Sequence, residues 1–327
     1  MILSFDSIIM NPPYIITSEI LKLVTSISER IGEINATHLY KPTTELRKKN
    51  RIKTIQSSLE IEGNTLTEEQ ITALLENKRV IAPKKDILEV QNAIKVYYKL
   101  NEFNPYQLKD LEKAHLILMN GLIDNAGKLR TTNVGILKGS KVEHVAPNGT
   151  MIKGLMKDLF AYLKKNTGLI LIKSCVFHYE FEFIHPFIDG NGRMGRLWQT
   201  LILMQQYPVF EFLPIESLIK QKQNEYYAKL SESDKKGSST PFIEFMLGII
   251  LNALEELLQS QNKTLRPEDR IALFKEKIGQ NKFKRKDYLQ SFKNISAPTA
   301  SRDLKWAVEQ SILMKFGEQR LTEYQFR

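Results

Sequence analysis

Twelve consecutive residues, 185–196, bring together side chains that could transfer a phosphate-containing group. The segment reads His-Pro-Phe-Ile-Asp-Gly-Asn-Gly-Arg-Met-Gly-Arg. His185 can exchange a proton near neutral pH, and Asp189 offers the oxygen ligand that Mg²⁺ prefers beside phosphates. A glycine-flanked turn at the start of a helix leaves backbone N–H groups unpaired, so it favours an anion. That turn consists of Gly190, Asn191 and Gly192.

Two arginines and an apolar run follow the turn. Arg193 and Arg196 lie three residues apart, so on a helix both guanidinium groups lean to one side and can grip phosphate oxygens. The run from Leu197 to Met204 could carry them on that helix. Taken singly, such a turn, a histidine and an arginine pair usually have structural explanations. Their conjunction at this tight spacing favours a phosphate-transfer site.

The same segment resembles, at every fixed position, the signature His-x-Phe-x-Asp/Glu-Gly-Asn-Gly-Arg-x-x-Arg of the Fic family. The resemblance implies a protein adenylyltransferase that moves AMP from ATP to a Ser, Thr or Tyr hydroxyl of a target protein or of itself. It also implies a mainly α-helical core with a short β-hairpin flap. We expect this likeness to span roughly residues 10–258.

The resemblance assigns a role to each residue of the signature. His185 would take the proton from the attacking hydroxyl, Asp189 would hold Mg²⁺, and Phe187 would anchor the loop by packing. The phosphates of ATP would be bound by Gly190, Asn191, Gly192, Arg193 and Arg196. The physical chemistry agrees, because phosphoryl transfer is mainly positioning and charge stabilisation, and a base adds about 10²–10⁴-fold.

A second motif lies upstream, in the segment Ser-Leu-Glu-Ile-Glu-Gly-Asn at residues 58–64. On a helix Ser58 and Glu62 are four apart and face the same way, and Gly63 is a plausible helix stop. The segment resembles the inhibitory motif of many Fic proteins. Glu62 would then pair with Arg196 and force ATP into an unproductive pose. A capped surface helix with an exposed acid is the alternative.

Two short apolar runs between these motifs predict a β-hairpin. They flank a glycine-containing turn at Gly139 and Ser140. In related Fic proteins a hairpin here lies over the active site and pairs with the backbone of the target. An ordinary surface hairpin is the alternative. The candidate docking residues are Ile136, Leu137, Val142 and Val145.

Composition restricts the class of protein. A hydrophobic fraction of 42% and a charged fraction of 26% are ordinary for a soluble globular protein. The sequence shows no signal peptide and no apolar run of bilayer length, so we expect no membrane partner and a cytoplasmic location. The single Cys175 sits in an apolar stretch and fits core packing in a reducing compartment. The five histidines show no zinc-ligand spacing.

Apolar periodicity predicts a chain made almost entirely of helices before residue 260. The predicted helices cover 15–35, 66–100, 106–124, 151–166, 169–183, 192–206, 217–230 and 240–259. We divide the chain into an N-terminal helical region carrying the inhibitory helix (1–104), a Fic catalytic core (105–258) and a small C-terminal domain (262–327).

The C-terminal part is strongly basic. Residues 261–327 hold 15 lysines and arginines against 8 aspartates and glutamates, which is +7 of the chain's net +10. Helices at 268–279, 285–292 and 297–311 followed by a hairpin resemble a winged helix-turn-helix. In that fold Arg302 and Lys305 would face DNA phosphates or base edges, which a positive balance suits. Winged helices also serve as protein-docking or dimer modules, so a homodimer stays open.

Three functions therefore compete. The first is the autoinhibited adenylyltransferase with ATP as substrate and Mg²⁺ as cofactor. The second is an enzyme of the same site that removes AMP or transfers another nucleotide or phosphate group. The third is a DNA-binding regulator whose core senses nucleotide without turning it over. The target protein and the choice of hydroxyl are not encoded in these motifs.

Overall fold

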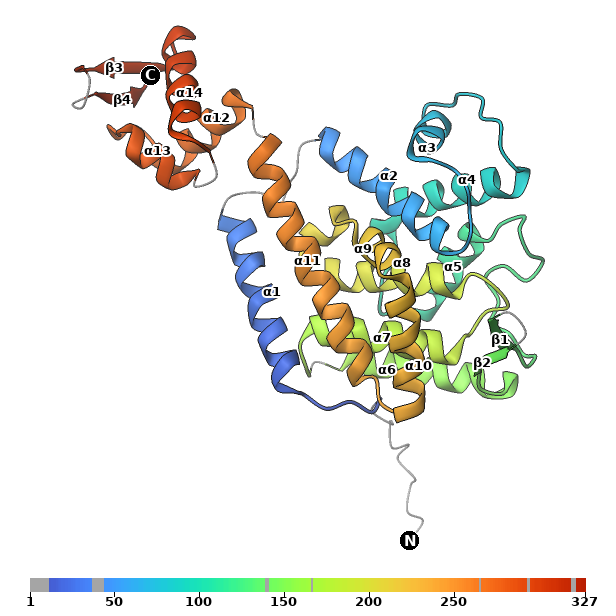
Figure 1. Cartoon of the computed structure of the whole chain (residues 1–327). Helices are drawn as coiled ribbons and strands as arrows, with labels where there is room; N and C mark the ends of the chain where they lie inside the picture. The colour runs from blue at the N-terminus through green and yellow to red at the C-terminus, as the bar shows by residue number, and fades with distance from the viewer. Residues whose placement is uncertain are drawn as a thin grey trace. The chain divides into compact units, whose positions relative to one another are not determined.

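The computed structural model describes residues 12–36, 44–138, 141–165, 167–264, 266–292, 295–318 and 322–327, although not the side chains of 44–45, 136–145 and 260–264. Its contacts divide the chain into two compact units, Met1–Glu33 with Tyr40–Leu254, and Ile34–Leu39 with Glu255–Arg327. In the described residues the first unit is helical except for one hairpin (Figure 1). The mainly α-helical fold expected from the sequence is confirmed.

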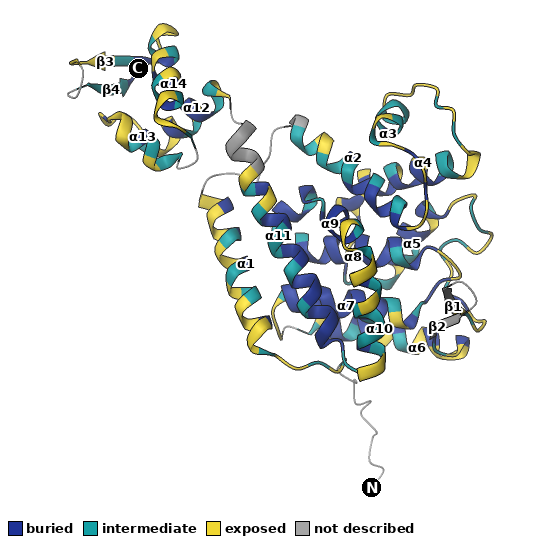
Figure 2. Cartoon of the chain, viewed as in Figure 1, coloured by how far each residue is buried: buried dark blue, intermediate teal, exposed yellow. Residues whose placement is uncertain are grey.

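Two central helices form the core of the first unit. α7 (Ile170–Ile184) and α8 (Asn191–Met204) are buried on nearly every face, and Figure 2 shows both in dark blue. α7 is largely apolar, and a helix that is apolar on all sides must be enclosed by others. The signature loop connects the end of α7 to the start of α8, so its two ends are fixed by the best-packed helices of the unit.

Helices from distant parts of the sequence surround α7 and α8. Residues before α1 (Ser18–Ala36) run along the start of α11 (Thr240–Thr264), where the Ile15 N–H donates to Thr240 Oγ1 at 3.0 Å and Thr17 Oγ1 donates to Glu244 Oε1 at 2.6 Å. The remaining elements of the unit are α2 (Thr44–Ile61), α3 (Glu68–Leu75), α4 (Lys84–Tyr98), η1 (Leu100–Glu102), α5 (Leu108–Leu118), η2 (Gly149–Met151), α6 (Ile152–Lys164), η3 (Pro208–Phe212), α9 (Ile215–Gln221) and α10 (Gln223–Lys236).

Two of the expected helices are each broken in two. The stretch 66–100 is α3 and α4, because Thr67 caps a short first helix and Pro83 precedes the second. Proline disfavours helical backbone in the residue before it, which ends the continuity that the periodicity suggested. The stretch 217–230 is interrupted at Lys222, between α9 and α10.

The predicted hairpin is present as two antiparallel strands, β1 (Gly135–Lys138) and β2 (Lys141–Val145). Ile136 pairs with His144 and Leu137 pairs with Val142, and the register shifts between these two pairs. Gly139 and Ser140, and the side chains of the four candidate docking residues, lie outside the described residues. The backbone prediction is confirmed, whereas the docking role stays a prediction.

The second unit contains the three helices and the hairpin expected at the C-terminus. They are α12 (Pro267–Ile278), α13 (Arg285–Ser291), α14 (Ala297–Glu309), β3 (Leu313–Phe316) and β4 (Glu323–Phe326). β3 and β4 are antiparallel, and Phe283 adds one bridge to Tyr324. The unit has its own apolar core, which includes Phe274, Tyr288 and Leu304.

The proposed domain limits at 104/105 and 258/262 remain predictions. Among the described residues, no helix combines the length and apolar composition needed to cross a bilayer.

Candidate active site

His185 stands at the end of α7 in a left-handed backbone conformation. Its φ is 49° and ψ is 62°, and its N–H donates to Phe181 O at 3.0 Å as the last bond of the helix. Only a few per cent of non-glycine residues have positive φ, and such strain is typical of functional sites. The conformation turns the chain sharply out of α7 and presents the imidazole to a pocket.

A buried arginine holds this sharp turn in place. Arg130 is 3% exposed and donates to the carbonyl oxygens of His185 (2.6 Å) and Ile184 (3.0 Å). It also donates to the carbonyls of Thr132 and Pro147, which flank the hairpin. One guanidinium therefore ties the signature loop to both ends of the β1–β2 segment. No sequence pattern indicated this role, because arginines are mostly exposed.

The loop between the helices is closed from inside by Asn191. Its Oδ1 accepts from the Phe187 N–H and its Nδ2 donates to Phe187 O, both at 2.9 Å. The ring of Phe187 is fully buried and stacks on His115 with centroids 3.6 Å apart. These contacts agree with the packing role expected for Phe187. The Asn191 side chain is occupied in holding the loop.

His115 is a second support that the sequence did not reveal. Its Nδ1 accepts from the Gly127 N–H at 2.8 Å, so Nε2 carries the proton and donates to Asp189 O at 2.9 Å. Burial lowers the pKa of His115 to about 4, so the ring is neutral at pH 7. It fixes the backbone of the loop without taking part in proton exchange.

Two glycines of the turn lie close to neighbouring side chains. Gly190 has a φ of 83°, and a Cβ there would lie 2.7 Å from Met119 Sδ. A Cβ on Gly192 would lie 2.5 Å from Glu62 Oε1 and 3.1 Å from Arg196 Nη1. The first glycine is needed for the turn itself. The second leaves room for side chains that meet above the start of α8.

Arg193 is held by carboxylates on both sides. Its Nη1 lies 3.3 Å from Glu89 Oε1, and its Nη2 lies 3.3 Å from Asp189 Oδ1. Glu89 is itself buried and accepts from Asn64 Nδ2 at 2.8 Å. Asn64 follows Gly63, which lies in the turn after α2 and has a φ of 91°. The segment after α2 is thus linked to the signature arginine through Glu89.

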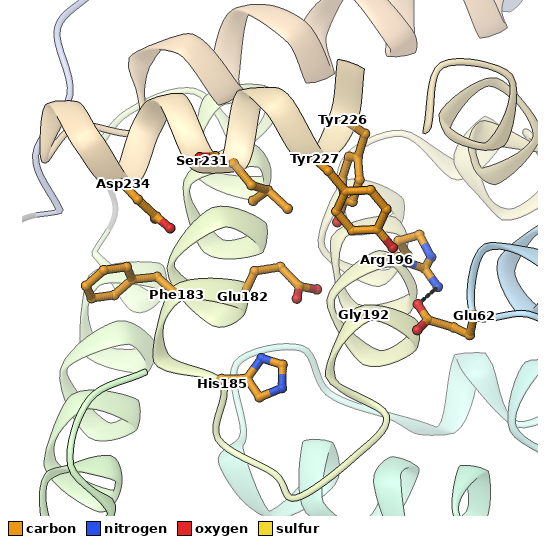
Figure 3. Close-up of a pocket in the computed structure, with 11 residues that line it drawn as sticks. Glu62, Glu182, Phe183, His185, Gly192, Arg196, Tyr226, Tyr227, Ser231 and Asp234 are labelled. Atoms are coloured by element: carbon orange, nitrogen blue, oxygen red, sulfur yellow. Dashed lines mark hydrogen bonds and ion pairs between the residues drawn. The ribbon is translucent and has the colours of Figure 1, made fainter. Parts of the chain in front are cut away.

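Arg196 meets the upstream motif directly. It is 2% exposed, and its Nε donates to Ser58 Oγ at 3.2 Å. Its Nη2 donates to Ser58 O at 2.9 Å and to Glu62 Oε1 at 2.8 Å. Figure 3 shows the last of these contacts as a dashed line. The structure therefore brings together Ser58, Glu62 and Arg196, although Glu62 lies one residue beyond the end of α2.

The end of α2 is held from the opposite side as well. Helix ends leave backbone carbonyls without partners in the helix. Lys220 Nζ donates to Glu60 O at 3.3 Å and Gln223 Nε2 donates to Ile61 O at 3.1 Å. These bonds fix the residues that place Glu62 above Gly192.

A pocket opens between the loop, α8 and α10. His185 lies on one side of it, and the Glu62–Arg196 pair lies on another (Figure 3). α10 contributes Tyr226, Tyr227, Leu230, Ser231 and Asp234, and the rest of the lining is Glu62, Glu182, Phe183, His185, Gly192 and Arg196. Among these described lining residues, Arg196 alone has a fixed positive charge, and three are acids. With Glu62 in place, the pocket is therefore unfavourable for a polyanion.

Tyr226 is anchored beneath the pocket by a buried polar chain. Its hydroxyl lies 3.0 Å from His178 Nε2, and His178 Nδ1 lies 2.7 Å from Gln199 Oε1. Burial lowers the pKa of His178 to about 3, so this ring is also neutral at pH 7. His185 is the one histidine among the described residues that line the pocket. The sequence motif did not point to α10, because its tyrosines lie outside the signature.

Replacing Arg130 with Met should lower the free energy of unfolding by about 3 kcal/mol, because the hydrogen bonds of a buried charged donor are lost. Denaturant unfolding would measure the change. Arg51→Met is the control, since Arg51 makes a single ion pair with Glu211 at 3.0 Å, with side chains 25% and 21% exposed, and its loss should cost less than about 1 kcal/mol. Equal losses in the two variants would contradict the role of Arg130 in holding the loop.

The chain is similar to proteins of one known family. The model of the Fic/DOC family matches residues 102–203. A crystal structure of a Fic family protein from Desulfovibrio desulfuricans G20 has 39% sequence identity and a TM-score of 0.75, with 97% of this chain and 98% of that chain covered. The chain belongs to the Fic family.

More distant relatives carry names that describe an activity. The protein adenylyltransferase fic-1 of Caenorhabditis elegans is 28% identical over 275 residues, which are 76% of this chain and 51% of the relative. A structure of residues 134–508 of C. elegans Fic-1 has a TM-score of 0.61 at 22% identity, with 75% of this chain and 74% of that chain covered, and supports the fold alone. The chain spans about half the length of the curated relatives it matches.

Proposed function

We propose that this chain is a protein adenylyltransferase that moves AMP from ATP to a side-chain hydroxyl of a target protein or of itself. One observation carries the proposal. A histidine, a helix N-terminus and a buried arginine border one pocket, and the segment between them is rigidly held by Arg130, His115 and Asn191. The relatives named protein adenylyltransferase support the same activity.

The start of α8 supplies the phosphate site. The first N–H groups of a helix have no partner within it and carry partial positive charge. Gly190 and Gly192 let a phosphate approach them closely. Arg193 and Arg196 add charge on the same side, and Asn191 contributes through its backbone because its side chain is bound to Phe187.

Asp189 is suited to a magnesium ion bound together with ATP. Its side chain is 54% exposed, and only Oδ1 is engaged, by the Gly190 N–H at 2.6 Å and by Arg193. Mg²⁺ in nucleotide sites commonly uses one or two carboxylates, phosphate oxygens and waters. When bound, the ion would neutralise charge on the phosphates. The described residues contain no group of three or more His, Cys, Asp or Glu side chains that could hold a metal by itself, so phosphate oxygens and waters would supply the other ligands.

His185 would accept the proton of the target hydroxyl as its oxygen attacks the α-phosphorus of ATP. The new O–P bond forms as the bond to the β-phosphate oxygen breaks, and pyrophosphate leaves towards Arg193 and Arg196. The base of the nucleotide would lie along α10, where Tyr227 and Leu230 offer flat and apolar surface. The β1–β2 hairpin would align the target by pairing with its backbone.

Glu62 would keep this site inactive. The 2.8 Å contact with Arg196 takes the guanidinium that the γ-phosphate needs and adds negative charge where the triphosphate must lie. Ser58 holds Arg196 from below, and Gly63 allows the turn that places Glu62. The inhibitory segment and the site it blocks are in one chain.

The activity can be tested with ATP that carries a label on one chosen phosphate. Incubation of the Glu62→Gly variant with ATP labelled at the α-phosphate should label protein, whereas ATP labelled at the γ-phosphate should not. Label from the γ-position would indicate phosphate transfer, and label from neither would indicate a nucleotide sensor. Loss of AMP from a pre-modified protein without ATP would favour removal of the group. Self-modification would appear as an added AMP in the mass of the purified protein. A homodimer and a cytoplasmic location stay predictions from the sequence.

Asp189→Ala should lower AMP transfer at least about tenfold at limiting Mg²⁺, with partial recovery at high Mg²⁺, because the ion loses its protein ligand. Transfer should stop in excess EDTA. Asp158→Ala, which removes an exposed carboxylate from α6, is the control and should leave transfer unchanged. These rates are measured in the Glu62→Gly background, where the site is free to act, and full activity of that protein in EDTA would contradict the metal assignment.

A further inference from the structure

One face of α14 in the second unit is exposed and positively charged. Arg302 and Lys305 are both exposed, and with Pro298 and the partly exposed Ser301 they recur at spacings of three and four. Ala300, Leu304 and Ala307 lie on the opposite face, in the core of the unit. Figure 2 shows α14 with exposed and buried residues on different sides.

The acidic residue within this stretch is turned inward. Asp303 is 1% exposed and accepts from Arg270 Nε at 2.6 Å and Nη2 at 2.8 Å. The Tyr288 hydroxyl also donates to it at 3.1 Å. Because Asp303 is neutralised inside the unit, it does not offset the charge on the outer face. The next acid, Glu309, is at the end of the helix, where it lies 3.7 Å from Lys305.

α13 extends the same face. Arg285 Nη1 donates to Ser301 Oγ at 2.8 Å, so the exposed start of α13 lies against the exposed side of α14. Lys284 and Lys286, on either side of it, are exposed as well. The two helices of the pair thus present cations next to one another.

We propose that this cationic face, made of Arg285, Ser301, Arg302 and Lys305, binds double-stranded DNA. A helix with its side chains is about 10–12 Å across, which matches a major groove about 12 Å wide. α14 would enter the groove by this face. Arg285 would contact a phosphate beside it, as the first helix of such a pair crosses the backbone. The charge complements phosphate, and the short polar Ser301 lets base edges come close.

Salt dependence tests the proposal on the full chain. Fluorescence anisotropy would follow binding to a labelled duplex of mixed sequence from about 50 to about 200 mM salt. Wild-type affinity should fall steeply over this range. The double variant Arg302→Ala, Lys305→Ala should weaken binding about tenfold or more at the lowest salt and reduce the slope of log K against log salt by about 2.

A charge-matched variant provides the control. Lys275→Ala with Lys277→Ala removes two exposed cations from α12 in the same unit and should change affinity less than about threefold. Both pairs lie on the surface, so unchanged thermal melts would show intact folds. Equal losses in the two double variants would overturn the assignment to α14. Absence of duplex binding at low salt would overturn DNA as the ligand and favour a protein partner. Neither outcome would bear on the proposed AMP transfer, which is measured separately.

Discussion

Glu62→Gly should increase AMP transfer about ten- to hundredfold. The pair with Arg196 is partly buried, and removing one partner of such a pair commonly changes the free energy by a few kcal/mol. Here the vacated position can be taken by the γ-phosphate, so the freed guanidinium gains a ligand instead of being stranded. Initial rates with α-labelled ATP would measure the change.

Stability should change little in this variant. Glu62 lies beyond the last residue of α2, its side chain is 31% exposed, and Arg196 keeps both contacts with Ser58. Glu62→Gln should give an intermediate rate, because it removes the charge but keeps a group that can accept a hydrogen bond. Glu60→Gln, which alters a carboxylate two residues earlier, should leave the rate unchanged.

Adding Arg196→Ala to Glu62→Gly should cancel the gain, since the guanidinium that the phosphate would use is then missing. If Glu62→Gly leaves the rate unchanged in a protein that depends on His185, the end of α2 is a structural element and does not inhibit. A gain that survives Arg196→Ala would show that Glu62 acts through another contact.

The sequence predicted the part of the site whose residues are neighbours along the chain. The fixed residues of the signature span twelve positions, so a turn and one helix start are enough to place them. The spacing of Ser58 and Glu62 was also enough to predict that their side chains lie on the same side, because residues four apart on a helix face the same way. What it could not provide was the 2.8 Å contact with Arg196, which depends on how α2 packs above α8.

The supports of the loop were not predictable in the same way. Arg130 and His115 lie 55 and 74 residues from their partners His185 and Asp189, and nothing local distinguishes them from surface residues. Periodicity similarly joined α3 to α4, because apolar spacing does not register the break before Pro83. Tertiary packing places the two supports, because it acts between segments far apart in the sequence. The break between α3 and α4 instead follows from Thr67 and Pro83, which are local signals that apolar periodicity does not weigh.

His185→Asn should lower AMP transfer about 10²–10⁴-fold, because the proton of the attacking hydroxyl loses its acceptor. Asparagine is the informative substitution, since it tolerates the left-handed backbone that His185 adopts. His185→Ala should lose as much activity and should also lose about 1 kcal/mol of stability from the strained φ. Comparing the two variants separates the loss of the proton acceptor from the effect of the substitution on the backbone turn.

The measurement belongs in the Glu62→Gly background, where the pocket is free to take ATP productively. Nucleotide affinity, followed by calorimetry, should stay within about threefold, because the phosphate contacts come from the start of α8 and its arginines and not from His185. Ser231→Ala, which changes another lining residue of the pocket, should retain most of the transfer. If His185→Asn transfers AMP as fast as its parent, the proton must leave by another route and His185 serves only to shape the turn between α7 and α8.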